Sequence, residues 1–231
     1  MMGLEPNRGV ADYSRMNEAL HLDAGVYRNP YELMTFYDNH DMARMNARPE
    51  GFIDANNWLF TARGIPVVYY GSELAFMAGT KEHEGNRNYF GAENVARAQR
   101  GSIHAALARI AVVRRSSIAL QRGLQLNLQL EGDRAAFLRV YELGDVSETV
   151  LVLLNKGDAP AHFEISDCLD AGHWRDATGS GVVKVRKGAR LTLEVPAHGV
   201  RVLLRKGRIS NAALRTRLAR QMETLAIGAK R

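Results

Sequence analysis

The sequence has little cysteine, few aromatic side chains and no long apolar run. Its 231 residues contain one cysteine, Cys168, so no disulfide can form within the chain and a buried free thiol is expected. No stretch is long and apolar enough to span a bilayer. The first twenty residues lack the apolar segment of a signal peptide, which leaves localisation unassigned. With 46% apolar, 7% aromatic and 24% charged residues, the composition excludes a disordered chain and a disulfide-built mini-protein.

Acidic residues are scarce at the C-terminus, and this local deficit accounts for the formal net charge of +6. Residues 205–231 hold eight Lys and Arg side chains and one Glu, a net charge of +7. Residues 1–204 therefore sum to about −1, so the basic character belongs to a tail. We expect no nucleic-acid partner. A nucleic-acid-binding protein would instead lose binding when the tail is deleted, and would bind more weakly as salt increases.

The hydrophobic pattern changes near residue 122. Before it, apolar strands over 33–37 and 65–70 alternate with helical segments over 53–61 and 92–115. Strand, helix, strand, helix is typical of a parallel sheet with crossover helices. Strands that are covered by helices on both faces are apolar on both faces, as these two are. We therefore predict an α/β domain over residues 1–121.

The remaining chain predicts a different fold class. Seven short strands of alternating hydrophobicity, separated by Gly, Asp and Ser turns, predict an antiparallel β-sandwich over 122–206 with Trp174 in its core. Residues 207–231 form a basic amphipathic tail, whose Leu214, Leu218, Met222 and Leu225 share one helical face. That face is suited to packing on the body of the protein or on a partner.

The most informative polar cluster follows the first predicted strand. His40 and Asp41 stand at the end of the apolar run Leu33–Tyr37, where active-site groups lie in parallel barrels. Neighbouring side chains of a strand point to opposite faces, so both reach one ligand only if the chain is already turning there. The alternative is a capped strand end in which Asp41 bonds turn backbone. A second candidate is the long polar loop over 79–91, which contains Glu84 and Arg87.

Taken together, these segments carry a family resemblance. The order TFYDNHD (35–41), then a helix, then RGIPVVYYGSE (63–73), then a polar loop with the pair Asn86-Arg87, resembles the alpha-amylase family, glycoside hydrolase family 13. Within that family, these segments most resemble those of cyclomaltodextrin glucanotransferases and α-amylases. The resemblance covers roughly residues 13–204. It implies the C-terminal part of a (β/α)8 TIM barrel, about strands seven and eight, followed by an antiparallel β-sandwich.

The resemblance also implies site residues. Asp41 is expected to be the carboxylate that binds sugar hydroxyls and stabilises the transition state. His40 is expected to donate a hydrogen bond to the same sugar ring, and Arg87, with Glu84, to contact a glucose further along the non-reducing side. An α-glucan or maltooligosaccharide is the expected partner, and no cofactor is identified. The Ca²⁺ common in the family has its ligands largely in segments that this sequence does not contain.

The sequence departs from the family pattern in its catalytic carboxylates. A retaining glycosidase needs a nucleophile and a general acid about 5 Å apart. In the family they precede the Asn-His-Asp motif, and the nucleophile sits in a Gly-Phe-Arg-x-Asp type motif that is absent here. Glu5 and Asp12 are the upstream candidates, and neither follows an apolar strand. A complete barrel takes about 250 residues, so we expect only its last quarter.

Two functions from different classes stay open at this point. The first is a fragment of a hydrolase or transglycosylase that acts on α-1,4-glucan bonds by a retaining mechanism and lacks both catalytic carboxylates. The second is a non-catalytic maltooligosaccharide-binding or assembly module. Two strands cannot close a barrel, so we also expect the first half to be poorly supported compared with the sandwich. The oligomeric state is open.

Overall fold

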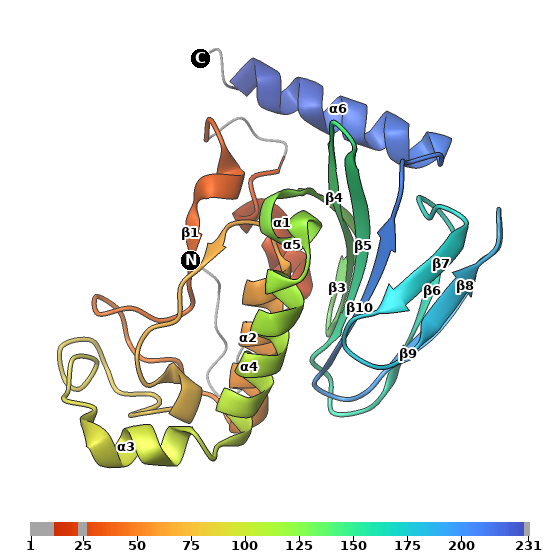
Figure 1. Cartoon of the computed structure of the whole chain (residues 1–231). Helices are drawn as coiled ribbons and strands as arrows, with labels where there is room; N and C mark the ends of the chain where they lie inside the picture. Colours follow the sequence, from red (N-terminus) through yellow and green to blue (C-terminus); the bar gives the residue numbers. More distant parts are fainter. Residues whose placement is uncertain (1–11, 23–26, 229–231) are drawn as a thin grey trace.

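The computed structural model describes residues 12–22 and 27–228 (Figure 1). The described residues before the first strand form the short helices η1 (Tyr13–Arg15), α1 (Met16–Ala19) and η2 (Pro30–Glu32). β1 (Met34–Thr35) then pairs in parallel with β2 (Ile65–Pro66). The connection between them is α2 (Pro49–Thr61), which begins at a proline in the position where a missing N–H costs nothing. The predicted strand–helix–strand crossover is therefore present.

The two parallel strands are shorter and more open than the sequence pattern predicts. β2 ends at Pro66, and the predicted buried strand over 65–70 is wrong. Ile65 is 50% exposed and Val67 36% exposed. Among the described residues no further strand pairs with the outer edge of β1 or β2.

The predicted helix over 92–115 is two helices. α3 (Gly91–Ala98) and α4 (Ser102–Arg115) are separated at Gly101, whose backbone is extended. α4 packs beside α2, and η3 (Ser72–Leu74) links β2 to the polar loop that precedes α3. α5 (Ile118–Arg122) then leads into the β region.

A six-stranded antiparallel sheet dominates the second half, in the order β3-β4-β5-β10-β7-β8. Its strands are β3 (Leu124–Glu131), β4 (Arg134–Leu143), β5 (Val146–Asn155), β7 (Gly172–Asp176), β8 (Val182–Val185) and β10 (Gly199–Lys206). β6 (Ala161–Ile165) and β9 (Leu191–Val195) form a separate antiparallel pair. The sequence pattern located every strand but β7.

Alternation along the central strands divides the core between the two faces of the large sheet. On β5, Val150, Val152 and Leu154 join the cluster that includes α2 and α4. Leu151 and Leu153 join the opposite cluster, which includes β6 and β9. The second cluster also contains Trp174 and Cys168, both buried as expected. Figure 1 shows α2 and α4 standing against the sheet on one side.

The basic tail forms α6 (Ala212–Gly228), which runs across the end of the sheet (Figure 1). Leu214 and Leu218 pack into the cluster that contains β6 and β9, so the helix docks on the body of the protein. The prediction for Met222 is wrong, because this side chain is 58% exposed. Gln221 is buried instead and donates to the carbonyl of Gln125 at 2.8 Å.

Candidate functional site

The site begins where the chain leaves β1. Tyr37 and Asp38 turn inward and are buried, and the Tyr37 hydroxyl donates to Asn56 Oδ1 of α2 at 3.0 Å. Asp38 accepts from the Met45 backbone N–H at 2.7 Å and from Ser72 Oγ at 3.1 Å. Burial raises the pKa of Asp38, against the lowering effect of these two hydrogen bonds. Asp38 therefore joins the turn after β1 to the turn after β2.

The next residues of the turn point outward. Asn39 Oδ1 accepts from the Asp41 backbone N–H at 2.7 Å, so Asn39 caps the turn and leaves the Asp41 carboxylate available. The Asp41 side chain is 61% exposed, and its Oδ2 lies 3.2 Å from His40 Nε2. The chain has turned at the strand end, as the convergence of His40 and Asp41 requires. Asp41 is not the residue that bonds the turn backbone.

The long polar loop brings Arg87 to the same place. Arg87 Nη2 lies 2.8 Å from Asp41 Oδ1, and Arg87 Nε donates to the His40 carbonyl at 3.1 Å. The predicted partner Glu84 is exposed in the same loop. Its side chain makes no hydrogen bond or ion pair with another described residue. The structure thus brings three of the four predicted site residues together and leaves Glu84 apart from them.

This cluster suits the recognition of hydroxyl groups. An exposed carboxylate flanked by an imidazole and a guanidinium offers two acceptor oxygens and several donors in one small area. Of the two upstream carboxylates, the structure describes Asp12, which has a different role. Asp12 Oδ1 accepts from the Ser14 and Gly132 backbone N–H groups, each at 2.8 Å, and so ties η1 to the turn between β3 and β4. Glu5 lies outside the described residues.

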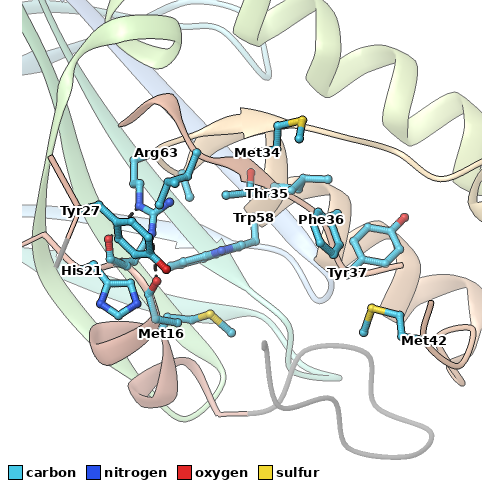
Figure 2. Close-up of a pocket in the computed structure, with 15 residues that line it drawn as sticks. Met16, His21, Tyr27, Met34, Thr35, Phe36, Tyr37, Met42, Trp58 and Arg63 are labelled. Atoms are coloured by element: carbon cyan, nitrogen blue, oxygen red, sulfur yellow. Dashed lines mark hydrogen bonds between the residues drawn. The ribbon is translucent and has the colours of Figure 1, made fainter. Parts of the chain in front are cut away.

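A groove of about 370 Å³ runs beside β1 and ends near the site. Figure 2 shows its lining, with His21, Tyr27 and Arg63 toward one end and Tyr37 and Met42 toward the other. The His21 and Tyr27 rings meet edge to face, with centroids 5.2 Å apart. Most of the lining is apolar, and Asp41 and Arg87 are not part of it. The groove adjoins the polar cluster without containing it.

Two residues that support the site escaped the sequence pattern. Arg44 and Asn86 are 3% and 0% exposed, although their types are normally on the surface. Arg44 donates to the carbonyls of Tyr70 and Asn86, which lie after β2 and in the polar loop. The only signal in the sequence was the position of Asn86 beside Arg87, within the quoted Asn-Arg pair.

Within residues 12–22 and 27–228, no group of three or more His, Cys, Asp or Glu side chains is arranged to hold a metal ion. No helix in the same part of the chain is long and apolar enough to cross a membrane.

Comparisons with known proteins point to one group of enzymes, although no family model matches the chain. A cyclomaltodextrin glucanotransferase of Geobacillus stearothermophilus is 28% identical over 169 residues, which are 71% of this chain and 22% of that enzyme. An Anoxybacillus α-amylase structure matches with a TM-score of 0.70 and 21% identity, over 88% of this chain and 44% of that one. An α-amylase of Geobacillus thermoleovorans, solved with acarbose, matches with a TM-score of 0.70 and 24% identity, over 87% and 45%.

These matches confirm the resemblance to part of an alpha-amylase family enzyme. The two solved structures show that this fold, with its α and β parts, occurs in α-amylases. The chain spans about a fifth of the curated relative and less than half of each solved structure.

Proposed function

We propose that this chain is part of an α-glucan-active glycosidase or glucanotransferase and carries its Asn-His-Asp sugar-binding corner. The observation that carries the proposal is the open cluster of Asp41, His40 and Arg87 at the carboxyl end of a parallel strand. That position is where barrel enzymes hold their active-site groups. The similarity to enzymes named cyclomaltodextrin glucanotransferase and α-amylase supplies the substrate class.

In this proposal Asp41 accepts hydrogen bonds from two sugar hydroxyls and strengthens them as positive charge develops on the ring. Contacts of this kind contribute several kcal/mol to the oxocarbenium-like transition state. Arg87 holds the Asp41 carboxylate in place through a hydrogen bond of 2.8 Å, and His40 donates to the same ring. The nucleophile and the general acid are supplied by segments other than the described residues. Acarbose, the carbohydrate in the Geobacillus thermoleovorans α-amylase structure, has the chemistry that such a corner recognises.

We also propose that residues 1–121 are part of a barrel, in which β1 and β2 are the seventh and eighth strands. Residues 122–206 then form the β-sandwich that follows the barrel, and residues 207–231 form a tail. The open edges of β1 and β2 favour this assignment. So do their exposed apolar side chains, among them Met34 at 68% and Ile65 at 50%. In a closed barrel each strand has a neighbour on both edges, and the side chains of the other strands and the outer helices would cover these groups.

The alternative is a non-catalytic maltooligosaccharide-binding or assembly module. It is favoured by one observation: in the described part of the chain, the side chains of His40, Asp41 and Arg87 contact one another and no second carboxylate. Both functions require sugar binding at Asp41, and they differ in what the complete protein does to the bound sugar.

Calorimetry with maltoheptaose tests the proposal. We expect the chain to bind with a dissociation constant on the order of 1 mM, since few contacts are available. Asp41→Asn should weaken binding about tenfold or more, because charge-assisted hydrogen bonds to the sugar are lost. It should leave thermal stability unchanged, because the Asp41 side chain is exposed. Asp145→Asn is the matched control, because Asp145 is an exposed carboxylate on the turn between β4 and β5.

Two results would contradict the proposal. The first is the absence of any binding heat at 10 mM maltoheptaose (roughly ten times the expected dissociation constant). The second is equal weakening in the Asp41 and Asp145 variants. Chromatography of the same mixtures checks cleavage, and we expect none from this chain alone because both catalytic carboxylates are missing from its motifs.

A further inference from the structure

A buried arginine lies beneath the candidate site. The Arg44 side chain is 3% exposed, and its guanidinium carbon stands 4.7 Å from the centroid of the Tyr69 ring and 4.8 Å from that of Tyr70. Phe76 adds a third ring at 5.3 Å. Rings in this position stabilise a desolvated cation through their negative faces. Arg44 therefore sits in an aromatic cage that the protein itself fills.

The hydrogen bonds of Arg44 go to backbone carbonyls of two separate loops. Nη1 donates to the Tyr70 carbonyl at 2.8 Å and Nη2 to the Asn86 carbonyl at 3.2 Å. The Tyr69 hydroxyl donates to the same Asn86 carbonyl at 2.8 Å. Only a rigid planar fork reaches both carbonyls in fixed directions, which an ammonium group on a flexible stem does not. The guanidinium thus fixes the polar loop relative to the end of β2.

Asn86 carries this constraint to the turn after β1. Its Nδ2 donates to the carbonyls of His40 and Met42 at 2.5 and 3.2 Å, and its Oδ1 accepts from the His83 N–H at 3.1 Å. With 0% exposure, Asn86 has no freedom to move while these bonds hold. The next residue is Arg87, whose guanidinium reaches both His40 and Asp41.

We propose that Arg44 is a positioning residue which, through Asn86, holds the Arg87 guanidinium against the Asp41 carboxylate, in the geometry that binds the hydroxyls of an α-linked glucose. The inference rests on the proposed function for its ligand. The claim that Arg44 controls the placement of Arg87 depends only on the contacts described above. Arg44 touches no exposed surface of the cluster, so its influence on a sugar is indirect.

The first experiment measures Arg87 itself. In ¹⁵N-labelled protein the Arg87 Nε–H signal, assigned with Arg87→Lys, reports the bond to the His40 carbonyl through its exchange with water. We expect Arg44→Lys to accelerate this exchange about tenfold, as loss of an ordered hydrogen bond does. Arg114→Lys is the matched control. Arg114 is also buried, at 8% exposed, and donates to the carbonyls of Phe60, Ala62 and Gly64, away from the polar loop.

A purely structural role for Arg44 predicts a different pattern. Both arginine variants would then lose thermal stability, and Arg87 Nε–H exchange would be unchanged or altered equally in the two. That result overturns the inference. If Arg44→Lys fails to fold, Asn86→Ser tests the same link, because it removes the Nδ2 donor to the His40 and Met42 carbonyls through which Arg44 would act. Unchanged Arg87 exchange in a folded Asn86→Ser protein also overturns the inference.

The second experiment measures maltoheptaose affinity at a temperature where every variant is folded. We expect Arg44→Lys to weaken binding about tenfold and Arg114→Lys to leave it unchanged. A freed Arg87 signal with unchanged affinity overturns the link between positioning and sugar binding. If the parent chain binds no maltoheptaose, the proposed function fails while the exchange measurement still decides the role of Arg44. The two failures are therefore distinguishable.

Discussion

The four polar residues that follow Tyr37 have three different environments. Asp38 is buried and accepts from the Met45 N–H and Ser72, while Asn39 closes the turn on the backbone of Asp41. His40 and Asp41 remain exposed and face Arg87. A buried, hydrogen-bonded aspartate next to a capping asparagine makes the turn rigid. Rigidity there lets the two exposed side chains hold their geometry without ligand.

Gly64 is the residue at which the crossover from α2 to β2 depends on having no side chain. Its φ is +100°, and a Cβ would stand 2.7 Å from Thr35 Cγ2 and 2.9 Å from the Leu33 carbonyl oxygen, both in or beside β1. We expect Gly64→Ala to lower the free energy of unfolding by about 1–3 kcal/mol, from backbone strain and this overlap. Urea unfolding measures it. Gly132→Ala is the control for positive φ without crowding, because no atom lies within 4 Å of its Cβ position. Equal losses in both variants would contradict the role of the close approach.

At the residue scale the sequence predicted candidate site residues, but not the different contacts that the residues of this turn make. The motif predicted that His40, Asp41 and Arg87 belong together, and the structure brings them into contact. Nothing local distinguishes Asp38 from Asp41, since the difference depends on Ser72 and Met45, which fold back from other segments. A buried Arg44 is likewise invisible in a sequence, where arginine predicts a surface.

At the scale of the elements, a histidine joins α2 to the turns of the β region. His198, in the turn between β9 and β10, lies with Nδ1 2.7 Å from Asp54 of α2 and Nε2 3.0 Å from Asp158. Arg48 also contacts Asp158, and Lys156 and Asp133 form a further ion pair nearby. Burial raises the pKa of Asp54 to about 7, against the lowering effect of His198. Burial lowers the pKa of His198, but the two carboxylates outweigh it and raise the pKa.

Both shifts have the same consequence for stability. A carboxyl and an imidazole with raised folded-state pKa values hold protons that the unfolded chain has released, so they stabilise at low pH and lose this contribution as pH rises. For Asp54, the contribution to stability is lost between its unfolded pKa of 3.8 and its folded pKa of about 7. For His198, it is lost above the ordinary pKa of 6.5. The hydrogen bond from His198 lowers the pKa of Asp158, whose contribution disappears only in acid, below 3.8.

We therefore predict that the free energy of unfolding falls by roughly 2–4 kcal/mol between pH 5 and pH 8, at about 1.4 kcal/mol per pKa unit. Urea titrations at the two pH values measure it. The variant Asp54→Asn should remove most of the fall, because the buried group no longer ionises. His198→Asn tolerates the positive φ of 51° at this position and should reduce the fall as well. A fall that persists undiminished in both variants would assign it to other groups.

Strands with three or more apolar residues were predictable, including the short strands β6, β8 and β9. β4 and β5 span ten residues each, most of them buried, and both were located. β7 was missed because Trp174 is its one apolar side chain and its other buried residue, Asp176, is charged. On α6, Gln221 is buried where the sequence pattern predicted Met222. The polar partners of Gln221, Tyr31 and Gln125, come from distant parts of the sequence.

At the scale of the whole molecule, the two halves share a core. Trp58 of α2 meets Phe137 of β4 edge to face with centroids 5.6 Å apart, and the fully buried Arg139 donates to the Thr61 and Gly123 carbonyls. Burial lowers the pKa of Arg139 to about 9. The sequence predicted a first half with poor support throughout. The helices α2 and α4 instead pack in one core with the sheet, whereas β1 and β2 have open outer edges and exposed apolar side chains. The difference arises because contacts between distant segments leave no trace in local periodicity.

This distribution of packing makes a prediction for native-state hydrogen exchange. Amides of β5, whose residues 148–155 are buried, should exchange most slowly, and those of α2 should approach them because α2 packs in the same core. The Ile65 and Val67 amides donate to the Leu33 and Thr35 carbonyls, but their side chains are exposed and the pair has two residues per strand. Small units with little buried apolar area open locally at a fraction of the global free energy, so these amides should exchange at least about 100-fold faster. Exchange at Ile65 and Val67 as slow as in β5 would mean that β1 and β2 are stable without neighbours on their outer edges, and would remove the support that their open edges give to the barrel assignment.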